Sequence, residues 1–426
     1  MKPHPHLAAA TPAEAAADTA VDAADRTKEK GRVQLANRVV VAAAMKQHPD
    51  RYTTLFARAR SEVGHAICLC RNDKVVRLVI RCRSGRYHLA NWPAEGHQHA
   101  PGCPWFRSHS SISGRSAYAD AITTTEHGTS IRLSAPLTVR GASASPSAKP
   151  AAAGKATGTS RRALGPLGLL HHLWENAQLN IWHPQHERRT WRTCQALLDE
   201  QVRDCEINKM PLTEALWIVP AFRPEHAERI NAGWDRFLAR LTTTGRTRHR
   251  GLVLGELRDA TSTKYSVRLS LRHQKAPLYA TPQLMNQVRR SYPAVFSEQT
   301  RQSSRPQLVL CVVELSPGGY ATVVEMAAML TTKSYLPVDS SHEAEMADAL
   351  VAARRAFIKP LRYDGDGVFP DFVLIDDERE TYIEVWGVRG RESYETRKRA
   401  KQSFYRDTGR TLIEWNVQDP LPDLVR

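Results

Sequence analysis

The sequence predicts a multidomain α+β protein with an α/β core at its C-terminus and a small β unit, rich in Cys and His, near its N-terminus. The chain has 426 residues, enough for two or three domains. A stretch rich in Ala, Ser, Pro and Gly at 140–162 has the composition of a flexible linker. Beyond it, segments with helical spacing give way to strand-like runs, and then to a helix, a hairpin and a second helix.

The overall composition is that of a soluble globular protein. Hydrophobic residues make up 42% and charged residues 24% of the chain. No apolar run approaches the roughly 20 residues that span a bilayer, so we expect no membrane partner. Acidic residues interrupt the Ala-rich N-terminus, which argues against a signal peptide, and the seven cysteines form no obvious disulfide framework. Together these features predict a reducing, cytoplasmic location.

The charge balance points to a polyanionic partner. The formal net charge is +16, and residues 51–110 hold ten Arg or Lys against three Asp or Glu. Such an excess favours nucleic acid, with DNA as the first expectation. The alternative is an arginine-rich proteome in which many proteins are basic.

The first two predicted segments are a disordered, low-complexity tail at 1–30 and a basic Cys/His unit at 31–139. Within the unit, Cys68 and Cys70 stand two residues apart, and His99 and Cys103 four apart in "HAPGC". Three thiols and an imidazole suit tetrahedral Zn²⁺, and four protein ligands predict a structural, zinc-ribbon-like site. His88 and His97 are rival ligands, and without zinc the same residues would be small core and surface side chains.

The run "RLVIRCR" between the two ligand pairs predicts a strand. Its Arg77, Arg81 and Arg83 share one face, which could follow phosphates. Cys82 alternates with the arginines and is predicted to be a buried core thiol.

After the linker, residues 163–304 predict an α+β middle section. Helical spacing occurs at 165–180, 190–205, 227–241 and 281–296, and strand-like runs occur at 250–257 and 265–272. A helix-turn-helix within 165–205 is an alternative, because His171, His172, Arg188, Arg189 and Arg192 supply some positive charge there.

A third domain is predicted at 305–426. Two strands flank a Pro-Gly-Gly turn, and a helix follows with Ser340 or Ser341 as its N-cap. Then come a hairpin at 368–387, a helix at 392–407 that ends near Gly409, and a last strand at 410–416.

The hairpin carries two carboxylates. Asp371 heads its first strand, and Glu384 lies on its second strand between Ile383 and Val385. Strand pairing would bring the two side chains close together, where a divalent cation relieves their repulsion. Mg²⁺ or Mn²⁺ held in this way can activate water and neutralise charge on a phosphodiester. The alternative is structural, with Asp371 capping a turn and Glu384 paired with Arg389 or Arg391.

This pattern resembles the PD-(D/E)XK, or restriction-endonuclease-like, nuclease superfamily over roughly residues 305–420. The matching residues are Pro370-Asp371, Glu384-Val385-Trp386 and a preceding helix that carries Glu343 and Glu345. The resemblance implies that Asp371, Glu384 and the Val385 carbonyl hold the metal. It also implies that an acidic residue of the helix, Glu343 rather than Glu345, assists.

Trp386 stands where the superfamily has its signature lysine. Tyr394, Lys398, Lys401 and Tyr405 share one helical face, and Lys401-Gln-Ser-Phe-Tyr405 looks like the Gln-x-x-x-Tyr element of RecB-type members. We therefore expect Lys398 or Lys401 to replace the missing lysine.

Other segments are similar to an uncharacterised bacterial family of plasmids and integrative conjugative elements: "CLC…YHL…HAPGCP", "LLHHLWENAQLNIWHP" and "FIKPLRYDGDGVFPDFVLID". The sequence thus predicts a metal-dependent, nuclease-like protein of a mobile element. The alternative is a catalytically inactive DNA-binding or scaffold protein on the same fold, for which Trp386 is the main indication.

Overall fold

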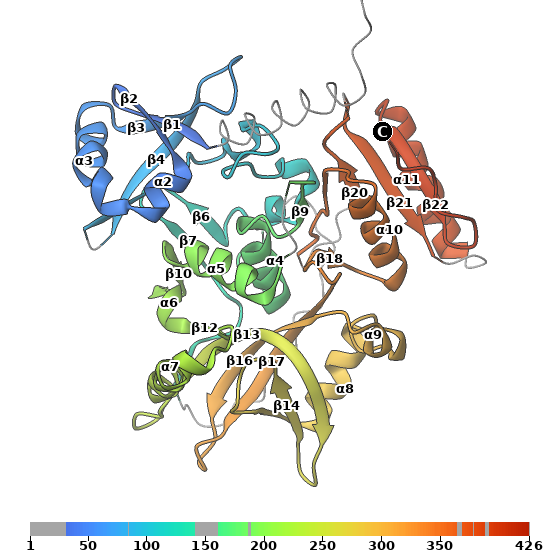
Figure 1. Ribbon diagram of the computed structural model, residues 1–426. Helices are drawn as coiled ribbons and strands as arrows, with labels where there is room; N and C mark the ends of the chain where they lie inside the picture. The colour runs from blue at the N-terminus through green and yellow to red at the C-terminus, as the bar shows by residue number, and fades with distance from the viewer. Residues whose placement is uncertain are drawn as a thin grey trace, which may run out of the picture. The chain divides into compact units, whose positions relative to one another are not determined.

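The computed structural model describes residues 31–83, 85–140, 161–185, 189–363, 369–377, 379–387 and 392–425 (Figure 1). The chain divides into two compact units, Met1–Arg107 and Ser108–Arg426, and each is described by itself. The tail predicted at 1–30 and most of the linker predicted at 140–162 lie outside the described residues. Within those residues, no helix has both the length and the apolar character needed to cross a membrane.

The first unit is built on one antiparallel sheet with the strand order β2-β1-β3-β4-β5. Its strands are β1 (Arg32–Leu35), β2 (Arg38–Val41), β3 (His65–Cys68), β4 (Val76–Arg83) and β5 (Arg86–Asn91). Helices α2 (Ala42–Gln47) and α3 (Thr53–Glu62) lie between β2 and β3 in the chain. Phe56 of α3 stacks on Tyr87 of β5 with ring centroids 5.8 Å apart, which packs the helix against the sheet.

The first unit ends at Arg107, whereas the sequence prediction placed its boundary at 139. Strands β6 (Ile122–Thr124) and β7 (Thr129–Ile131) join a four-stranded sheet in the second unit, of order β11-β10-β7-β6. There β7 runs parallel to β10 (Cys205–Ile207), which pairs with β11 (Met210–Pro211). The composition of residues 140–162 indicates a linker, but it does not reveal that β7 before the linker and β10 after it are joined by hydrogen bonds.

The largest sheet of the second unit is barrel-like. The long strand β13 pairs with β14 through one half and with β16 through the other. Because β14 pairs with β15, β15 with β17, and β17 with β16, these five strands close into a ring. The ring strands are β13 (Thr247–Ser262), β14 (Val267–Leu271), β15 (Leu278–Ala280), β16 (Gln307–Leu315) and β17 (Ala321–Thr331), with β8 (Thr138–Arg140), β12 (Leu216–Ile218) and β18 (Pro337–Val338) attached.

The ring changes the domain prediction at 305. The two strands flanking the Pro-Gly-Gly turn are β16 and β17, and they complete the barrel with β13 instead of opening a separate C-terminal domain. The middle section predicted at 163–304 therefore continues to about residue 338.

The last part of the chain forms a mixed sheet with the strand order β22-β21-β20-β19-β9 (Figure 1). Strand β20 is antiparallel to both β19 and β21, and β22 is parallel to β21. The predicted hairpin is confirmed as the β20–β21 pair. The bounds are β9 (Ile181–Trp182), β19 (Phe357–Ile358), β20 (Phe372–Leu374), β21 (Thr381–Trp386) and β22 (Thr411–Asn416), with helices α10 (Ser341–Ala352) and α11 (Glu392–Asp407).

The helices predicted in the middle section are confirmed. They are α4 (Pro166–Asn176), α5 (Trp191–Val202), α7 (Ala227–Arg240) and α8 (Pro282–Ser291), with the shorter α6 (Leu212–Ala215) and α9 (Glu298–Ser303) between and after them. Trp174 of α4 is fully buried, and its indole donates a 3.1 Å hydrogen bond to the carbonyl of Tyr335. Most of α4 is buried, including His171 and His172, so α4 itself offers no free face for a DNA groove.

Phe357→Ala is predicted to destabilise the second unit. Phe357 is fully buried in β19 between β9 and β20, and its ring meets Phe372 edge-on at 5.6 Å. Its truncation should lower the free energy of unfolding by about 3–5 kcal/mol in a denaturant titration. The matched control is Phe222→Ala, because Phe222 is 48% exposed. Equal denaturation midpoints for the two variants would contradict the packing described here.

Candidate functional site

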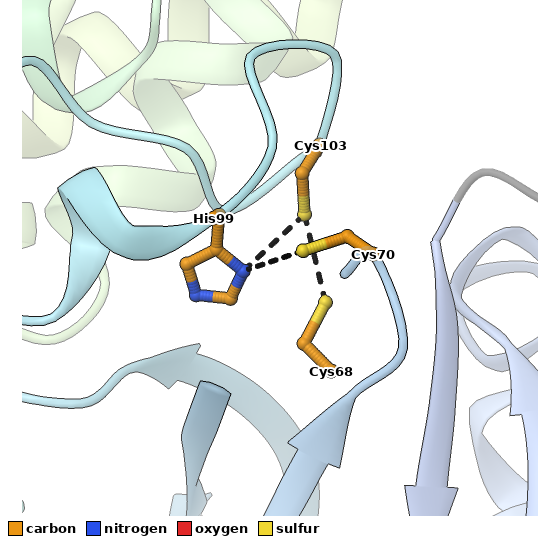
Figure 2. Close-up of side chains that lie close together, drawn as sticks. All are labelled: Cys68, Cys70, His99 and Cys103. Atoms are coloured by element: carbon orange, nitrogen blue, oxygen red, sulfur yellow. Dashed lines mark hydrogen bonds between the residues drawn. The ribbon is translucent and has the colours of Figure 1, made fainter. Parts of the chain in front are cut away.

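Two pairs of side chains meet in the first unit: the thiols of Cys68 and Cys70, and the imidazole of His99 with the thiol of Cys103. Cys68 ends β3 and Cys70 follows it, while His99 and Cys103 lie in the loop after the 3₁₀ turn Gly96–Gln98. The Cys68 and Cys103 sulfurs are 3.6 Å apart, and His99 Nδ1 lies 3.4 Å from the sulfurs of both Cys70 and Cys103 (Figure 2). The four ligand atoms all lie within 4.8 Å of one another, so this group could hold a metal ion.

The spacing of these atoms fits a tetrahedral ion. Metal–sulfur bonds of about 2.3 Å at tetrahedral angles place two sulfurs about 3.8 Å apart, close to the separation seen here. Cys103 and His99 are buried, and the neighbouring thiols together with burial raise the pKa of Cys103. Three thiolates this close repel one another, and a bound cation removes that repulsion.

The rival ligands His88 and His97 are not part of this cluster. The prediction for Cys82 is wrong, because its side chain is exposed at the end of β4. There the strand has run past the core, and Cys82 pairs with Tyr87 in the last register positions of the β4–β5 ladder. Strand alternation alone did not reveal where the covered part of the strand ends.

The three arginines predicted to follow phosphates differ in their surroundings. Arg77 is bound by the Glu95 carboxylate, and its guanidinium lies 4.3 Å from the centre of the Trp92 ring. Arg81 is half-buried opposite His88, and Arg83 is exposed opposite Arg86. Arg77 is therefore already neutralised, and positive charge gathers toward the β4–β5 turn.

In the second unit, the hairpin brings the two predicted carboxylates onto adjacent strands. Asp371 precedes β20, and its Oδ2 accepts a 2.8 Å hydrogen bond from the Val385 N–H of β21. Asp371 is 5% exposed and Glu384 is 1% exposed. Burial raises the pKa of Asp371, Lys359 opposes this shift, and the nearby charge of Glu384 adds to it. Two ionised carboxylates at this depth require compensating charge.

Lys401 of α11 supplies part of that charge. Its Nζ lies 2.8 and 2.7 Å from the two Glu384 oxygens and 2.9 Å from the Phe369 carbonyl. The Tyr405 hydroxyl donates to Glu384 Oε1 at 2.6 Å. The lysine and the tyrosine singled out on one helical face therefore both reach the same carboxylate.

Lys398, the other candidate, is placed differently. Its Nζ bonds Asn416 Oδ1 at 2.9 Å and lies 4.9 Å from the centre of the Trp386 ring. The Trp386 indole donates to Glu414 at 2.7 Å. Arg389 and Arg391, the alternative partners of Glu384, and the side chain of Tyr394 lie outside the described residues.

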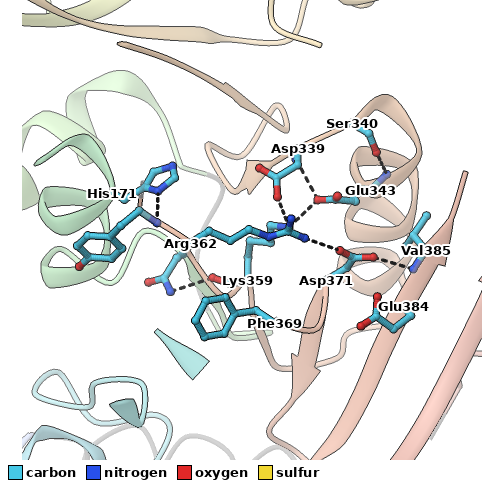
Figure 3. A network of polar contacts seen from close by, with 12 residues as sticks. His171, Asp339, Ser340, Glu343, Lys359, Arg362, Phe369, Asp371, Glu384 and Val385 are labelled. Atoms are coloured by element: carbon cyan, nitrogen blue, oxygen red, sulfur yellow. Dashed lines mark hydrogen bonds and ion pairs between the residues drawn. The ribbon is translucent and has the colours of Figure 1, made fainter. Parts of the chain in front are cut away.

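Sequence reasoning missed two cations and one carboxylate of this site (Figure 3). Lys359, 1% exposed, directs its Nζ 2.6 Å from Glu343 and 3.0 Å from Asp339. The Arg362 guanidinium lies 3.7 Å from Asp371 Oδ1. The signal available was a lysine within the apolar run "AFIKPL", because a buried lysine needs anionic partners.

Glu343, the predicted helix carboxylate, faces this group from the first turn of α10. Its Oε2 also accepts the Asp339 N–H at 2.9 Å. Burial raises the pKa of Glu343 to about 7, against the effect of Lys359 and with a contribution from Asp339 and Asp371. Glu345 instead lines a separate small cavity with Arg305 and Ser341.

Four carboxylates and three cations thus surround the hairpin: Asp339, Glu343, Asp371 and Glu384, with Lys359, Arg362 and Lys401. Across the described ranges, only the Cys/His cluster brings three or more Cys, His, Asp or Glu ligand atoms close enough to hold an ion. The four carboxylates lie farther apart from one another than the ligand atoms of the Cys/His cluster. An ion between Asp371 and Glu384 would therefore rely on these two carboxylates together with main-chain and water oxygens.

A buried polar network adjoins Arg362. The neighbouring Tyr363 donates its N–H to His171 Nδ1 at 3.0 Å and its hydroxyl to Glu175 at 2.8 Å. The Ser113 hydroxyl donates to the same Glu175 oxygen at 2.8 Å. Burial lowers the pKa of His171 to about 4 and that of His172 well below its ordinary value. The residues beside the site are therefore anchored to α4 by neutral histidines.

The His171 anchor predicts acid lability. Between pH 6.5 and about 4 the unfolded chain binds a proton at His171 that the folded chain does not bind. The free energy of unfolding should fall as the pH drops through this window, by up to about 3 kcal/mol from this residue. In denaturant titrations, His171→Gln should show a shallower pH slope than wild type. His127→Gln, at an 80% exposed side chain, should keep the wild-type slope. An unchanged slope in His171→Gln would refute the assignment.

One family model matches the chain. It is described as protein of unknown function (DUF1173), and it covers residues 40–417. The match spans most of the chain, so the chain belongs to this family. No curated protein and no solved structure matches it.

Proposed function

We propose that this member of the DUF1173 family is a metal-dependent, nuclease-like protein that hydrolyses nucleic-acid phosphodiester bonds at Asp371 and Glu384. The observation that carries the proposal is the contact between Lys401 and Glu384, beside Asp371. A lysine four residues before Tyr405 on α11 reaches the carboxylate next to which the superfamily signature has its own lysine. A structural hairpin alone would not require this convergence.

The order of elements supports a restriction-endonuclease-like core. Helix α10 is followed by three antiparallel strands, β19 to β21, and then by α11 and the parallel strand β22. The resemblance to the PD-(D/E)XK superfamily implied the order helix, strand, hairpin turn, strand, helix, strand, to which the short strand β19 is an addition before the hairpin. Asp371 heads the first hairpin strand, β20, and Glu384 lies on the second, β21, in agreement with that resemblance.

The donor set fits Mg²⁺ or Mn²⁺. Asp371 and Glu384 offer hard oxygen ligands, and the Val385 carbonyl would complete the protein side. The Arg362 guanidinium lies 3.7 Å from Asp371 Oδ1, which is too long for a hydrogen bond. When bound, such an ion supplies an acidified water molecule and neutralises charge on the phosphodiester.

Besides the metal ligands, three side chains of this site have separate roles in the proposed reaction. Lys401 holds positive charge beside Glu384, where charge develops on the phosphate oxygens during hydrolysis. Tyr405 orients Glu384 through its hydroxyl, and Lys359 keeps Glu343 and Asp339 in place on the helix side. Lys398 is too engaged with Asn416 and Trp386 to share the role of Lys401.

A catalytically inactive nucleic-acid binder or scaffold is the second candidate. Trp386 replaces the signature lysine, and both Glu384 oxygens already have partners in Lys401 and Tyr405. In this function the same charge network would only stabilise the fold.

In the first unit, we propose that the Cys/His cluster holds a structural zinc ion. Zinc prefers thiolate and imidazole ligands, and four protein ligands leave no position open for water. The ion would fix the loop at 99–103 against β3, at the Val76 end of β4 and away from the basic β4–β5 turn. Arg81 and Arg83 would then contact nucleic acid, in a cytoplasmic protein of a mobile element.

The nuclease proposal predicts cleavage of labelled single-stranded, duplex or branched DNA, or of RNA, with Mg²⁺ or Mn²⁺. Asp371→Asn, Glu384→Gln and Lys401→Met should each lower the rate by about 100-fold or more, because each removes a charge at the reacting phosphate. Lys398→Met, on the same helix, is the control and should stay within a few-fold of wild type. Thermal melting of each variant checks that it is folded.

Two results would decide against catalysis. Wild-type protein that cleaves none of these substrates would favour the inactive binder, as would cleavage that survives Asp371→Asn unchanged. Full cleavage by folded Lys401→Met would remove Lys401 from the mechanism.

Elemental analysis of purified protein should find about one zinc per chain. Cys70→Ser and Cys103→Ser should lose the metal, and the first unit should melt at a lower temperature because the ion joins two segments distant in the chain. Cys82→Ser, at an exposed thiol, should keep it. A metal-free wild-type protein from zinc-supplemented cells would contradict the assignment.

A further inference from the structure

A row of outward-facing side chains encircles the barrel of the second unit. Direct strand partners connect Arg250 with Glu314, Glu314 with Thr322, Thr322 with Tyr279, Tyr279 with Arg268, and Arg268 with Thr261. Direct partners in a sheet point to the same face, so the six side chains form one continuous row across β13, β16, β17, β15 and β14.

The row lies on the outer surface of the barrel. Its members are exposed or half-buried, whereas their chain neighbours on β14, β15 and β17 are buried: Val267, Leu269, Leu278, Ala280, Ala321 and Val323. Strict alternation of this kind separates a solvent face from a core face. The row is therefore accessible along its length.

Two tyrosines stand together on this face. Tyr279 of the row and Tyr320, which precedes β17, meet edge to face with ring centroids 5.6 Å apart. Tyr320 is 61% exposed, and its backbone is held by hydrogen bonds to Ser316. An exposed aromatic pair on a rigid strand end offers ring faces at little cost in conformational entropy.

Arginines flank the tyrosine pair on both sides. Arg268 is exposed in the strand next to Tyr279. On the other side, Arg250 and Arg248 lie 3.0 and 3.7 Å from Glu314, the one carboxylate of the row. Glu314 neutralises Arg250, so the positive charge beside the tyrosines comes from Arg268 and from Arg248, whose side chain is 62% exposed, while Asp259 accepts from Thr261 at the end of the row.

We propose that this strip, Arg268, Tyr279, Tyr320, Thr322 and Arg248, binds single-stranded nucleic acid. Bases stack on the tyrosine rings and the arginines contact the phosphates, the combination by which proteins bind single strands without sequence preference. Paired bases of a duplex expose no face to the rings, so a duplex does not compete. The inference goes beyond the proposed function and does not require cleavage.

The test measures fluorescence anisotropy of a labelled oligo-deoxythymidine of about 20 nucleotides with the full chain, in buffer without divalent ions or chelator. Tyr279→Ala combined with Tyr320→Ala should weaken binding about 30-fold or more, because two lost stacked bases at about 1–3 kcal/mol each cost at least about 2 kcal/mol. Tyr279→Phe with Tyr320→Phe keeps both rings and should bind as wild type. Arg268→Ala should also weaken binding, and Phe222→Ala, at an exposed aromatic residue outside the strip, should not.

Because Tyr320 is exposed, Tyr320→Ala alone tests the strip even if the double variant does not fold. Wild-type affinity in folded Tyr320→Ala and Arg268→Ala would overturn the proposal, as would equal losses for single-stranded and duplex DNA. Asp371→Asn should bind the oligonucleotide as wild type, so loss of cleavage and loss of strip binding are separable results.

Discussion

The buried ammonium of Lys359 is the contact on which the C-terminal site depends. It bonds Glu343 of α10 and Asp339 just before that helix, and its own backbone N–H bonds Asn180 next to β9. One residue thus connects α10, β19 and β9. An ammonium at this depth is stable only among anions, and the carboxylates in turn require it. The pairing of charges therefore fixes where α10 sits relative to the sheet.

The same constraint explains the other half of the site. Glu384 is almost fully buried, and Lys401 with Tyr405 of α11 satisfies its oxygens. The helix is positioned by the partners of one carboxylate, on the opposite side of the hairpin from α10. Asp371 is less fully compensated: it has one short main-chain hydrogen bond, and Arg362 stands farther away. The negative charge left unbalanced there is what a bound cation could neutralise.

The two units hold segments that are distant in the chain together by different means. In the first unit, a small sheet is tied to a loop distant in sequence through three thiols and an imidazole. A small core gains most from such a link when a bound ion completes it. In the second unit, strand closure into a barrel and an extensive core fix the fold, and its outward row is free to carry polar and aromatic groups.

The sequence by itself determined the helices, the β20–β21 hairpin, the ligand set Cys68, Cys70, His99 and Cys103, and the candidate carboxylates Asp371 and Glu384. These follow from local periodicity, turn residues and side-chain chemistry, which are written in neighbouring positions. Tertiary structure alone decided that Lys401 rather than Lys398 meets Glu384, that Lys359 and Arg362 join the site, and that β16 and β17 belong to the barrel. The reason is physical: strand partners and buried charge pairs join residues far apart in the chain, and only the folded backbone brings them within bonding distance.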